Sequence, residues 1–325
     1  MKNVLLTGAS GFVGRHVYRA LKKNGYWVRA AIRDSKFQES SGQPLADEYV
    51  QIDEISGETV WLEALNNIDY VVHLAARVHV MNDRVVNPIS EFRRVNRDGT
   101  LRLGHSCVQA GIKRFIFLSS AKVHGEGSAV PYTEASPIAP EDPYSVSKAE
   151  AEQELVQLVN SSNGKMSSVT LRPPLVYGPG VKANFLNLIR LVLTGVPLPL
   201  GAIHNQRSII YVGNLADAIV HSLNAEVIAS QTYLVSDGVD FSTPDLVRAI
   251  ATAANRRSRL IAIPEIFLTS AAKILGKGPT LARLTGSLRL DISSIQKSLE
   301  WKPKIPPEEG FRETVRWFTE GRTAW

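Results

Sequence analysis

The stretch "VLLTGASGFVG" at residues 4–14 decides the fold. It opens with apolar residues typical of a buried strand and then places glycines at positions 8, 11 and 14. The residues that follow carry apolar side chains at helical spacing. A strand, a glycine-rich turn and a helix N-terminus together suit a pyrophosphate group, because glycines allow close backbone approach and the helix presents free N–H groups. The stretch therefore predicts a dinucleotide-binding unit.

The alternation of apolar runs and helical patterns continues along the chain. Strand-like runs bounded by turn residues lie at residues 3–7, 27–32, 69–74, 114–119, 168–172 and 232–237. Nearly continuous apolar strands that alternate with helices indicate a parallel sheet covered on both faces. We expect an α/β protein with a Rossmann-type doubly wound parallel sheet.

Beyond Arg172 the alternation loosens and Pro and Gly become frequent, as in "RPPLVYGPG" and "KPKIPP". This change predicts a smaller C-terminal substrate-binding lobe that is intercalated with the last strands. We expect a dinucleotide-binding domain over residues 1–172, with contributions from about 208–240, and a mainly substrate-binding lobe over residues 173–325.

Composition limits the function classes. The formal net charge of +6 favours anionic ligands, but the positive residues form no basic stripe of the nucleic-acid-binding kind. No apolar run approaches the ~20 residues of a membrane span, and we expect no charged-then-apolar leader at the N-terminus. A single cysteine, Cys107, excludes a disulfide framework and a multi-cysteine metal site. We expect a cytoplasmic protein with no metal, no nucleic-acid partner and no membrane insertion.

A candidate reacting centre lies in "PEDPYSVSKAEAEQEL", where Tyr144 and Lys148 are one helical turn apart. The run "FIFLSSAKVHG" ends a strand at Ser119 and Ser120, and ligands of open α/β sheets bind at strand carboxyl ends. A phenol can exchange a proton with a carbonyl or an alcohol if an adjacent ammonium lowers its pKa from about 10. Tyr144 and Lys148 therefore predict proton transfer, with a serine hydroxyl orienting the substrate oxygen.

Over essentially its full length the chain resembles an extended short-chain dehydrogenase/reductase of the nucleotide-sugar epimerase/dehydratase type. The matching pieces are "TGASGFVG", "VVHLAA", "VNRDGT", "FLSSAKVHG", "PYSVSK", "LRPPLVYGPG", "RSIIYVGNLADAI" and "LDISSIQKSLEWKPKIPPEEGFRETVRWF". The resemblance implies that Ser120, Tyr144 and Lys148 are the catalytic trio. It also implies a homodimer built from the segment around residues 89–111 and the Tyr144 helix.

The resemblance carries further residues over to this sequence. Ala75 and Ala76 would line the nicotinamide side, Asn96 would brace the central helix, and Arg207 would hold the diphosphate of a nucleotide-sugar. The full cofactor-binding set is Gly8, Ser10, Gly11, Phe12, Val13, Gly14, Arg33, Asp53, Leu74, Ala75, Ala76, Asn96, Tyr144 and Lys148. The substrate-binding set is Arg77, His79, Ser120, Lys122, Lys182, Asn184 and Arg207.

Family members differ in the reaction that follows hydride transfer at the sugar's C4. The 4,6-dehydratases carry an Asp-Glu pair where this chain has Ala121 and Lys122, so water elimination lacks its acid and base here. Members that epimerise next to the ketone use a cysteine and a histidine, but Cys107 lies on a helical pattern before the strand and is expected in the core. A 4-epimerase that keeps NAD and a 4-keto-sugar reductase that consumes its coenzyme both survive.

The turn after residues 27–32 bears on this choice. The family's epimerases have an Asp where this chain has Ile32, and Arg33 adds a cation suited to a 2′-phosphate. Asp34, one position on, could still serve NAD. The pattern favours NADP(H) over NAD(H) and hence a reductase.

The chain also resembles bacterial surface-polysaccharide (lipopolysaccharide O-antigen) enzymes through "LAARVHVMND" and "LRPPLVYGPGVKANF". Leu175 replaces an Asn, and His124 a Tyr, of the better-known epimerases. The implied reaction reduces a UDP-4-keto-6-deoxy-N-acetylhexosamine to its quinovosamine or fucosamine form, with Tyr144 as proton donor. The alternative is a UDP-glucose or UDP-N-acetylglucosamine 4-epimerase, and a remote one is a non-catalytic NADP-binding protein.

Overall fold

A computed structural model describes residues 2–34, 46–78, 87–128, 130–226, 229–274 and 278–321. Its larger sheet has seven parallel strands in the order β3-β2-β1-β4-β5-β6-β9. These strands are β1 (Asn3–Thr7), β2 (Trp27–Ile32), β3 (Glu48–Gln51), β4 (Tyr70–His73), β5 (Arg114–Leu118), β6 (Ser167–Arg172) and β9 (Ser230–Leu234). The predicted α/β class and doubly wound parallel sheet are confirmed.

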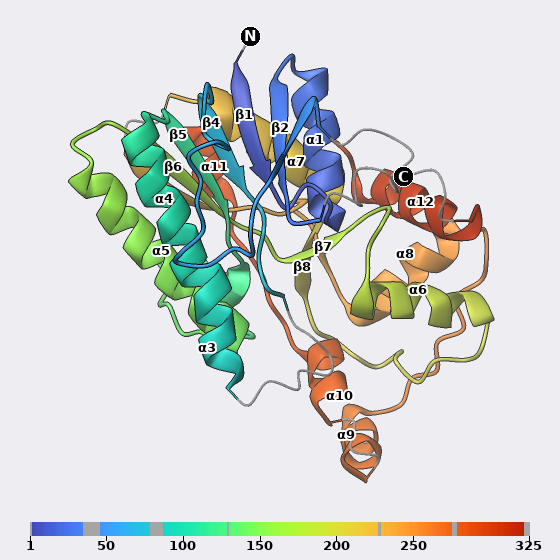
Figure 1. The fold of residues 1–325 in the computed structure, drawn as a ribbon. Helices are drawn as coiled ribbons and strands as arrows, with labels where there is room; N and C mark the ends of the chain where they lie inside the picture. The colour runs from blue at the N-terminus through green and yellow to red at the C-terminus, as the bar shows by residue number, and fades with distance from the viewer. Residues whose placement is uncertain are drawn as a thin grey trace.

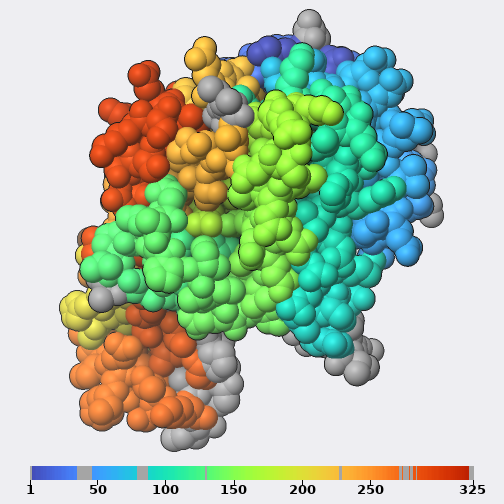
Figure 2. Space-filling model, turned by 90° about the vertical axis from the view of Figure 1, so that its left-hand side faces the viewer, coloured from blue at the N-terminus to red at the C-terminus, as the bar shows by residue number. Residues whose placement is uncertain are grey.

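Helices cover both faces of this sheet (Figure 1). On one face lie α1 (Phe12–Lys23) and α7 (Val212–Asn224), and on the other lie α4 (Gly99–Ala110) and α5 (Pro143–Ser161). The central strands are mainly apolar because each face packs on a helix layer, and Val4, Leu5 and Leu6 of β1 are fully buried. Figure 2 shows α4 and α5 lying side by side over the outer face.

A second sheet of three strands has the order β10-β8-β7, with β7 at Leu175–Tyr177, β8 at Arg207–Tyr211 and β10 at Asp240–Phe241. Around it pack α6 (Ala183–Thr194), α8 (Thr243–Ala253) and α12 (Pro307–Thr319), which share one apolar cluster (Figure 1). The other helices are α3 (Pro88–Phe92), α9 (Glu265–Ile274), α10 (Gly278–Thr285), α11 (Ser293–Ser298), the π-helix η1 (Arg93–Asp98) and the 3₁₀-helix η2 (Ala121–His124). The division near residue 172 stays a prediction.

The strand predictions need correction. The sequence patterns predict no strand at 48–51, where β3 is a short edge strand with an exposed residue at each end, and none at the positions of β7 and β10. The run expected at 232–237 pairs with β6 over Ser230–Leu234 instead, because Asp237 turns away to accept hydrogen bonds from the Tyr211 N–H and the Asn214 side chain. None of the helices in the described part of the chain is long and apolar enough to cross a bilayer.

Candidate active site

The glycine turn between β1 and α1 forms a backbone cradle. Gly8 has φ +73, and a Cβ added to it would lie 2.8 Å from the Ala75 nitrogen. A Cβ on Gly14 would lie 2.1 Å from the Gly8 oxygen. Gly11 caps α1 without a side-chain hydrogen bond, and the first helical turn has no acidic residue. The amides around Phe12 and Val13 are therefore free of side-chain caps and suit an anionic pyrophosphate.

The strand order brings the other predicted segments to the same edge. Because β1 lies between β2 and β4, the carboxyl ends of β1, β4 and β5 are adjacent. Leu74 to Ala76 directly follow β4, and the Ala75 N–H donates to Thr7 Oγ1 at 3.2 Å. Ser120 follows β5 and caps η2 by accepting the N–H of Lys122 at 3.2 Å. This edge is where open α/β sheets bind dinucleotides.

Helix α5 delivers Tyr144 to this edge. Asp142 caps the helix, accepting the N–H of Ser145 at 2.7 Å, while Ser145 Oγ accepts the N–H of Asp142 in a reciprocal capping box. Pro143 occupies the first turn, where its missing N–H costs nothing. The capped start fixes the position of Tyr144, whose hydroxyl lies close enough to Ser120 for that side chain to act on the Tyr144 pKa.

The electrostatics of Tyr144 differ from the expectation. Burial raises the pKa of Tyr144, the nearby Asp142 carboxylate raises it further, and the Ser120 side chain acts in the opposite direction. Lys148 is not among the groups that act on it. The prediction that the ammonium lowers this pKa is thus wrong for the conformation seen, because Lys148 Nζ donates to the Leu118 carbonyl oxygen at 2.8 Å.

Lys148 is only 1% exposed. Its ammonium lies 4.4 Å from the centre of the Phe117 ring. Burial lowers the pKa of Lys148 to about 7, although the carboxylate of Glu152 acts to raise it. A lysine in this environment exchanges a proton near neutral pH.

Charged side chains gather on the other side of Ser120. Lys122 Nζ pairs with Asp142 Oδ2 and with Glu126 Oε1, both at 2.5 Å. Arg207, at the start of β8, lies close enough to Glu126 for that carboxylate to raise its pKa against the larger, lowering effect of burial. The structure therefore brings Ser120, Lys122 and Arg207 toward one region.

The sequence model of the NAD-dependent epimerase/dehydratase family matches residues 4–236. The chain belongs to this family of nucleotide-sugar enzymes. It is 41% identical over 323 residues to a UDP-glucose 4-epimerase from Vibrio cholerae, covering 98% of this chain and 96% of the relative.

Solved structures of the family agree with this fold. A UDP-N-acetylglucosamine 4-epimerase from Methanobrevibacter ruminantium M1, in complex with UDP-N-acetylmuramic acid, superposes with a TM-score of 0.79 at 27% identity and covers 98% of both chains. MoeE5 in complex with UDP-glucuronic acid and NAD superposes with a TM-score of 0.77 at 26% identity, covering 98% of this chain and 99% of the other.

The remaining predicted residues are more scattered. Arg33 and Asp53 are exposed, just beyond β2 and β3. Arg94 lowers the pKa of the Glu54 carboxyl, and Arg33 is close enough to Glu54 to lower this pKa further. Lys182 lies beside Ser10 and Phe12 in a hollow of about 220 Å³.

Asn184 is exposed on α6. The backbone of Arg77 bonds to the Asn96 side chain, and its guanidinium lies 5.5 Å from the Phe92 ring centre. His79 lies outside the described residues.

Asn96 supports the helix rather than facing the glycine turn. Its Nδ2 donates to Ser147 Oγ at 3.0 Å, and Ser147 donates to the Tyr144 carbonyl oxygen at 2.7 Å. The sequence patterns did not indicate Ser147, Asp142 or His73 as residues of the site. Only the N-cap pattern Asp-Pro before Tyr144 could have identified one of them, because the other two are recognisable only by their partners in space.

Proposed function

We propose that this protein is a UDP-sugar 4-epimerase that works with bound NAD. The proposal rests on one geometric observation: Tyr144, in the first turn of α5, and Ser120, directly after β5, lie at the sheet edge that also holds the glycine turn. The 41% identity to the Vibrio cholerae UDP-glucose 4-epimerase supports epimerisation over the reductase favoured by the residues after β2.

In this proposal each residue has one task. The NAD coenzyme, held by the amides of Gly11 to Val13, supplies the two-electron chemistry at C4. Tyr144 takes the proton from the sugar's 4-hydroxyl and later returns it, and Ser120 holds the same oxygen by a hydrogen bond. Lys148 is buried one helical turn after Tyr144 and donates to Leu118 O, and its task is to donate to the coenzyme's ribose.

The substrate side is assigned by charge. Arg207 binds the diphosphate, because its partly buried guanidinium presents a planar cation to phosphate oxygens. Lys122 stands where an eliminating enzyme needs a carboxylate, and the structure pairs it with Glu126 and Asp142. We infer that its role is to neutralise these carboxylates next to the sugar, which leaves no free acid for loss of water.

A reductase that uses NADP(H) is the second candidate, and one observation favours it. Ile32 is buried at the end of β2, so the position offers no carboxylate, while Arg33 is exposed directly after it. A 2′-phosphate would gain the Arg33 cation there and would not meet a carboxylate at position 32.

One comparison of activities separates the candidates. Purified protein is given UDP-glucose or UDP-N-acetylglucosamine without added coenzyme, and the C4 epimers are resolved by chromatography. In a second assay a UDP-4-keto-6-deoxy-N-acetylhexosamine is supplied with NADPH or NADH, and absorbance at the nicotinamide band is followed. Epimer formation without added coenzyme supports the proposal, and stoichiometric oxidation with no epimer formation overturns it.

Tyr144→Phe is the control in both assays. The variant should lose about a hundredfold or more of the turnover, because its ring keeps the packing but carries no exchangeable proton. Coenzyme binding should persist. Unchanged turnover would remove Tyr144 from the proposed mechanism.

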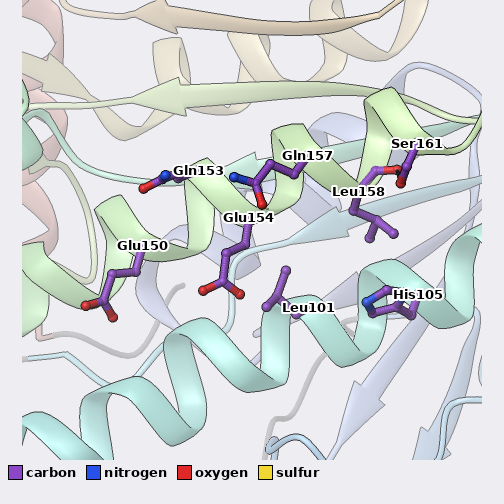
Figure 3. Close-up of a pocket in the computed structure, with 8 residues that line it drawn as sticks. All are labelled: Leu101, His105, Glu150, Gln153, Glu154, Gln157, Leu158 and Ser161. Carbon is purple, nitrogen blue, oxygen red and sulfur yellow. Dashed lines mark hydrogen bonds between the residues drawn. The ribbon is translucent and has the colours of Figure 1, made fainter.

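We further propose a homodimer formed through α4 and α5. A hollow of about 600 Å³ lies between these helices on their outer side, with Leu101 and His105 from α4 and Glu150, Glu154 and Leu158 from α5 among its lining residues (Figure 3). A second copy would fill it with its own helix pair. Sedimentation should give a dimer, and Leu101→Asp should shift it to monomer; a monomeric wild-type protein would reject this assembly.

A further inference from the structure

His73, at the end of β4, is fully buried, and the proposed reaction does not use it. Its ring stacks on Phe117 with 6.0 Å between ring centres and 14° between planes, and it contacts Phe115 at 5.9 Å. Both ring nitrogens have hydroxyl partners: Nδ1 faces Thr7 Oγ1 at 2.7 Å and Nε2 faces Thr100 Oγ1 at 3.0 Å. This imidazole thus bridges two hydroxyls from different elements inside an aromatic pocket.

The outer partners of the two threonines fix the hydrogens. Thr100 Oγ1 donates to the Asn96 carbonyl oxygen at 2.6 Å, so it can only accept from His73. Nε2 therefore carries the ring proton, and Nδ1 accepts from the Thr7 hydroxyl. Thr7 Oγ1 in turn accepts the N–H of Ala75. Each donor then has an acceptor, and only the neutral Nε2–H ring satisfies the whole set.

The surroundings keep the ring neutral. Burial, followed by the positive charge of Lys148, lowers the pKa of His73 to about 3. Its hydrogen-bond and ring partners are the Thr7 and Thr100 hydroxyls and the rings of Phe115 and Phe117, none of which carries a negative charge. His73 is therefore unsuited to acid–base work at ordinary pH, and what it offers is a fixed donor and a fixed acceptor.

The two ends of this hydrogen-bonded set are the two halves of the candidate site. At one end Thr7 and Ala75 flank Gly8. This position must be glycine, because a Cβ added to it would lie only 2.8 Å from the Ala75 nitrogen. At the other end Thr100 bonds to Asn96, which lies in the π-helix η1 and supports α5 through Ser147. π-Helical turns are rare and often occur at functional sites.

We propose that His73 is a positioning residue that couples the coenzyme turn at Thr7 and Ala75 to the Asn96 support of the Tyr144 helix. It acts as a permanently neutral Nε2–H imidazole and touches neither the sugar nor the reacting atoms. The inference requires only that the glycine turn binds NAD(P), so it is independent of which sugar the protein uses.

The first test is spectroscopic and uses the wild-type protein. Nitrogen-15 labelling of histidine should give, for His73, the shifts of a neutral Nε2–H tautomer that do not change between about pH 5 and pH 8. A Nδ1–H tautomer, or titration within this range, would overturn the assignment.

The second test measures NAD affinity of the coenzyme-free protein by calorimetric titration. His73→Phe keeps an aromatic ring but leaves the buried Thr7 hydroxyl without its acceptor, and we expect roughly tenfold weaker binding. His73→Gln can still accept from Thr7 and donate to Thr100, so it should recover most of the affinity. For both variants the KM of the sugar should be unchanged while kcat follows the coenzyme affinity.

Phe115→Leu is the matched control, because it removes packing against the same ring and no hydrogen bond. It should lower the unfolding temperature without weakening NAD binding. If Phe115→Leu and His73→Phe weaken NAD binding equally, or if His73→Gln gives no recovery, His73 contributes only packing and the proposal fails. Failure of the epimerase assay would leave these binding and spectroscopic results unaffected.

Discussion

The ammonium group of Lys148 lies 4.4 Å from the centre of the Phe117 ring and donates a hydrogen bond to the Leu118 carbonyl oxygen. These contacts stabilise the ammonium less than water would. Burial therefore lowers the pKa of Lys148 from 10.5 to about 7. Below about pH 7 the group is protonated in both the folded and the unfolded chain, and folding carries the full cost of the buried charge. Between about 7 and 10.5 only the unfolded chain keeps the proton, so this cost falls as pH rises.

Lys148→Met should therefore stabilise the protein while abolishing turnover. At about pH 6 we expect the free energy of unfolding to rise by roughly 1–3 kcal/mol, with the gain fading toward pH 10. Urea unfolding of the coenzyme-free wild-type protein and variant at both pH values measures this difference in the free energy of unfolding. Lys302→Met, at an exposed position, should change little. If Lys148→Met were less stable than the wild-type protein at every pH, burial of the Lys148 ammonium would carry no free-energy cost.

Asp142→Asn should shift the pH dependence of the reaction. The Asp142 carboxylate raises the pKa of Tyr144, so its removal lowers that pKa, and the Lys122 ammonium, relieved of one partner, acts in the same direction. Asn keeps the helix cap, so α5 should remain in place. We expect the pH at which kcat/KM rises to move down by about half a unit to one unit.

Asp245→Asn, in the first turn of α8, is the control for this effect and should leave the profile unchanged. An upward movement, or equal shifts in the two variants, would contradict the role given to Asp142.

The sequence predicted the sheet well because buried strands and the glycine turn depend on local patterns, and the catalytic trio stays a prediction. Buried strands such as β1 and β5 are apolar along their middle positions, and the glycine turn has a fixed spacing. The edge strand β3 was not predicted because only Val50 of its four residues is buried. Edge strands of four residues carry too few apolar positions to stand out.

The supporting network could not be predicted from the sequence. His73 lies inside the apolar run "YVVHL", where a histidine resembles any core residue until its partners Thr7 and Thr100 are known. These residues are 66 and 27 positions away in the chain. The direction of the Tyr144 pKa was wrong for a similar reason, because chain spacing placed Lys148 near the phenol but could not show that it bonds to Leu118.

Arg33→Ala tests the coenzyme preference. If Arg33 contacts a 2′-phosphate, its removal should lower the NADP affinity by about ten- to a hundredfold and leave the NAD affinity nearly unchanged. Titration of the coenzyme-free protein with each dinucleotide gives the ratio. Ile32→Asp should reverse the preference by restoring an acceptor for the 2′-hydroxyl. Equal losses of NAD and NADP affinity in Arg33→Ala would mean that Arg33 does not contact the 2′-phosphate.

The buried pair of Arg172 and Glu152 offers a matched test of stability. Arg172 Nε donates to both carboxylate oxygens of Glu152 at 3.0 and 3.1 Å, and the two side chains are 8% and 7% exposed. Arg172 Nη1 also lies 2.9 Å from His124 Nε2, which must accept this bond, so His124 Nδ1 carries the proton that is donated to Pro137 O. The guanidinium thus has a single carboxylate partner among the described residues.

Glu152→Gln leaves this guanidinium buried without its counter-charge and should cost about 3–5 kcal/mol of unfolding free energy. Arg248→Gln, on α8, removes a guanidinium from a pair with Asp245 whose side chains are 55% and 50% exposed. Water screens that pair, so its loss should cost about 1 kcal/mol or less. Urea unfolding of the two variants measures the difference, and equal costs would mean that water reaches Arg172 after the substitution and replaces the missing charge.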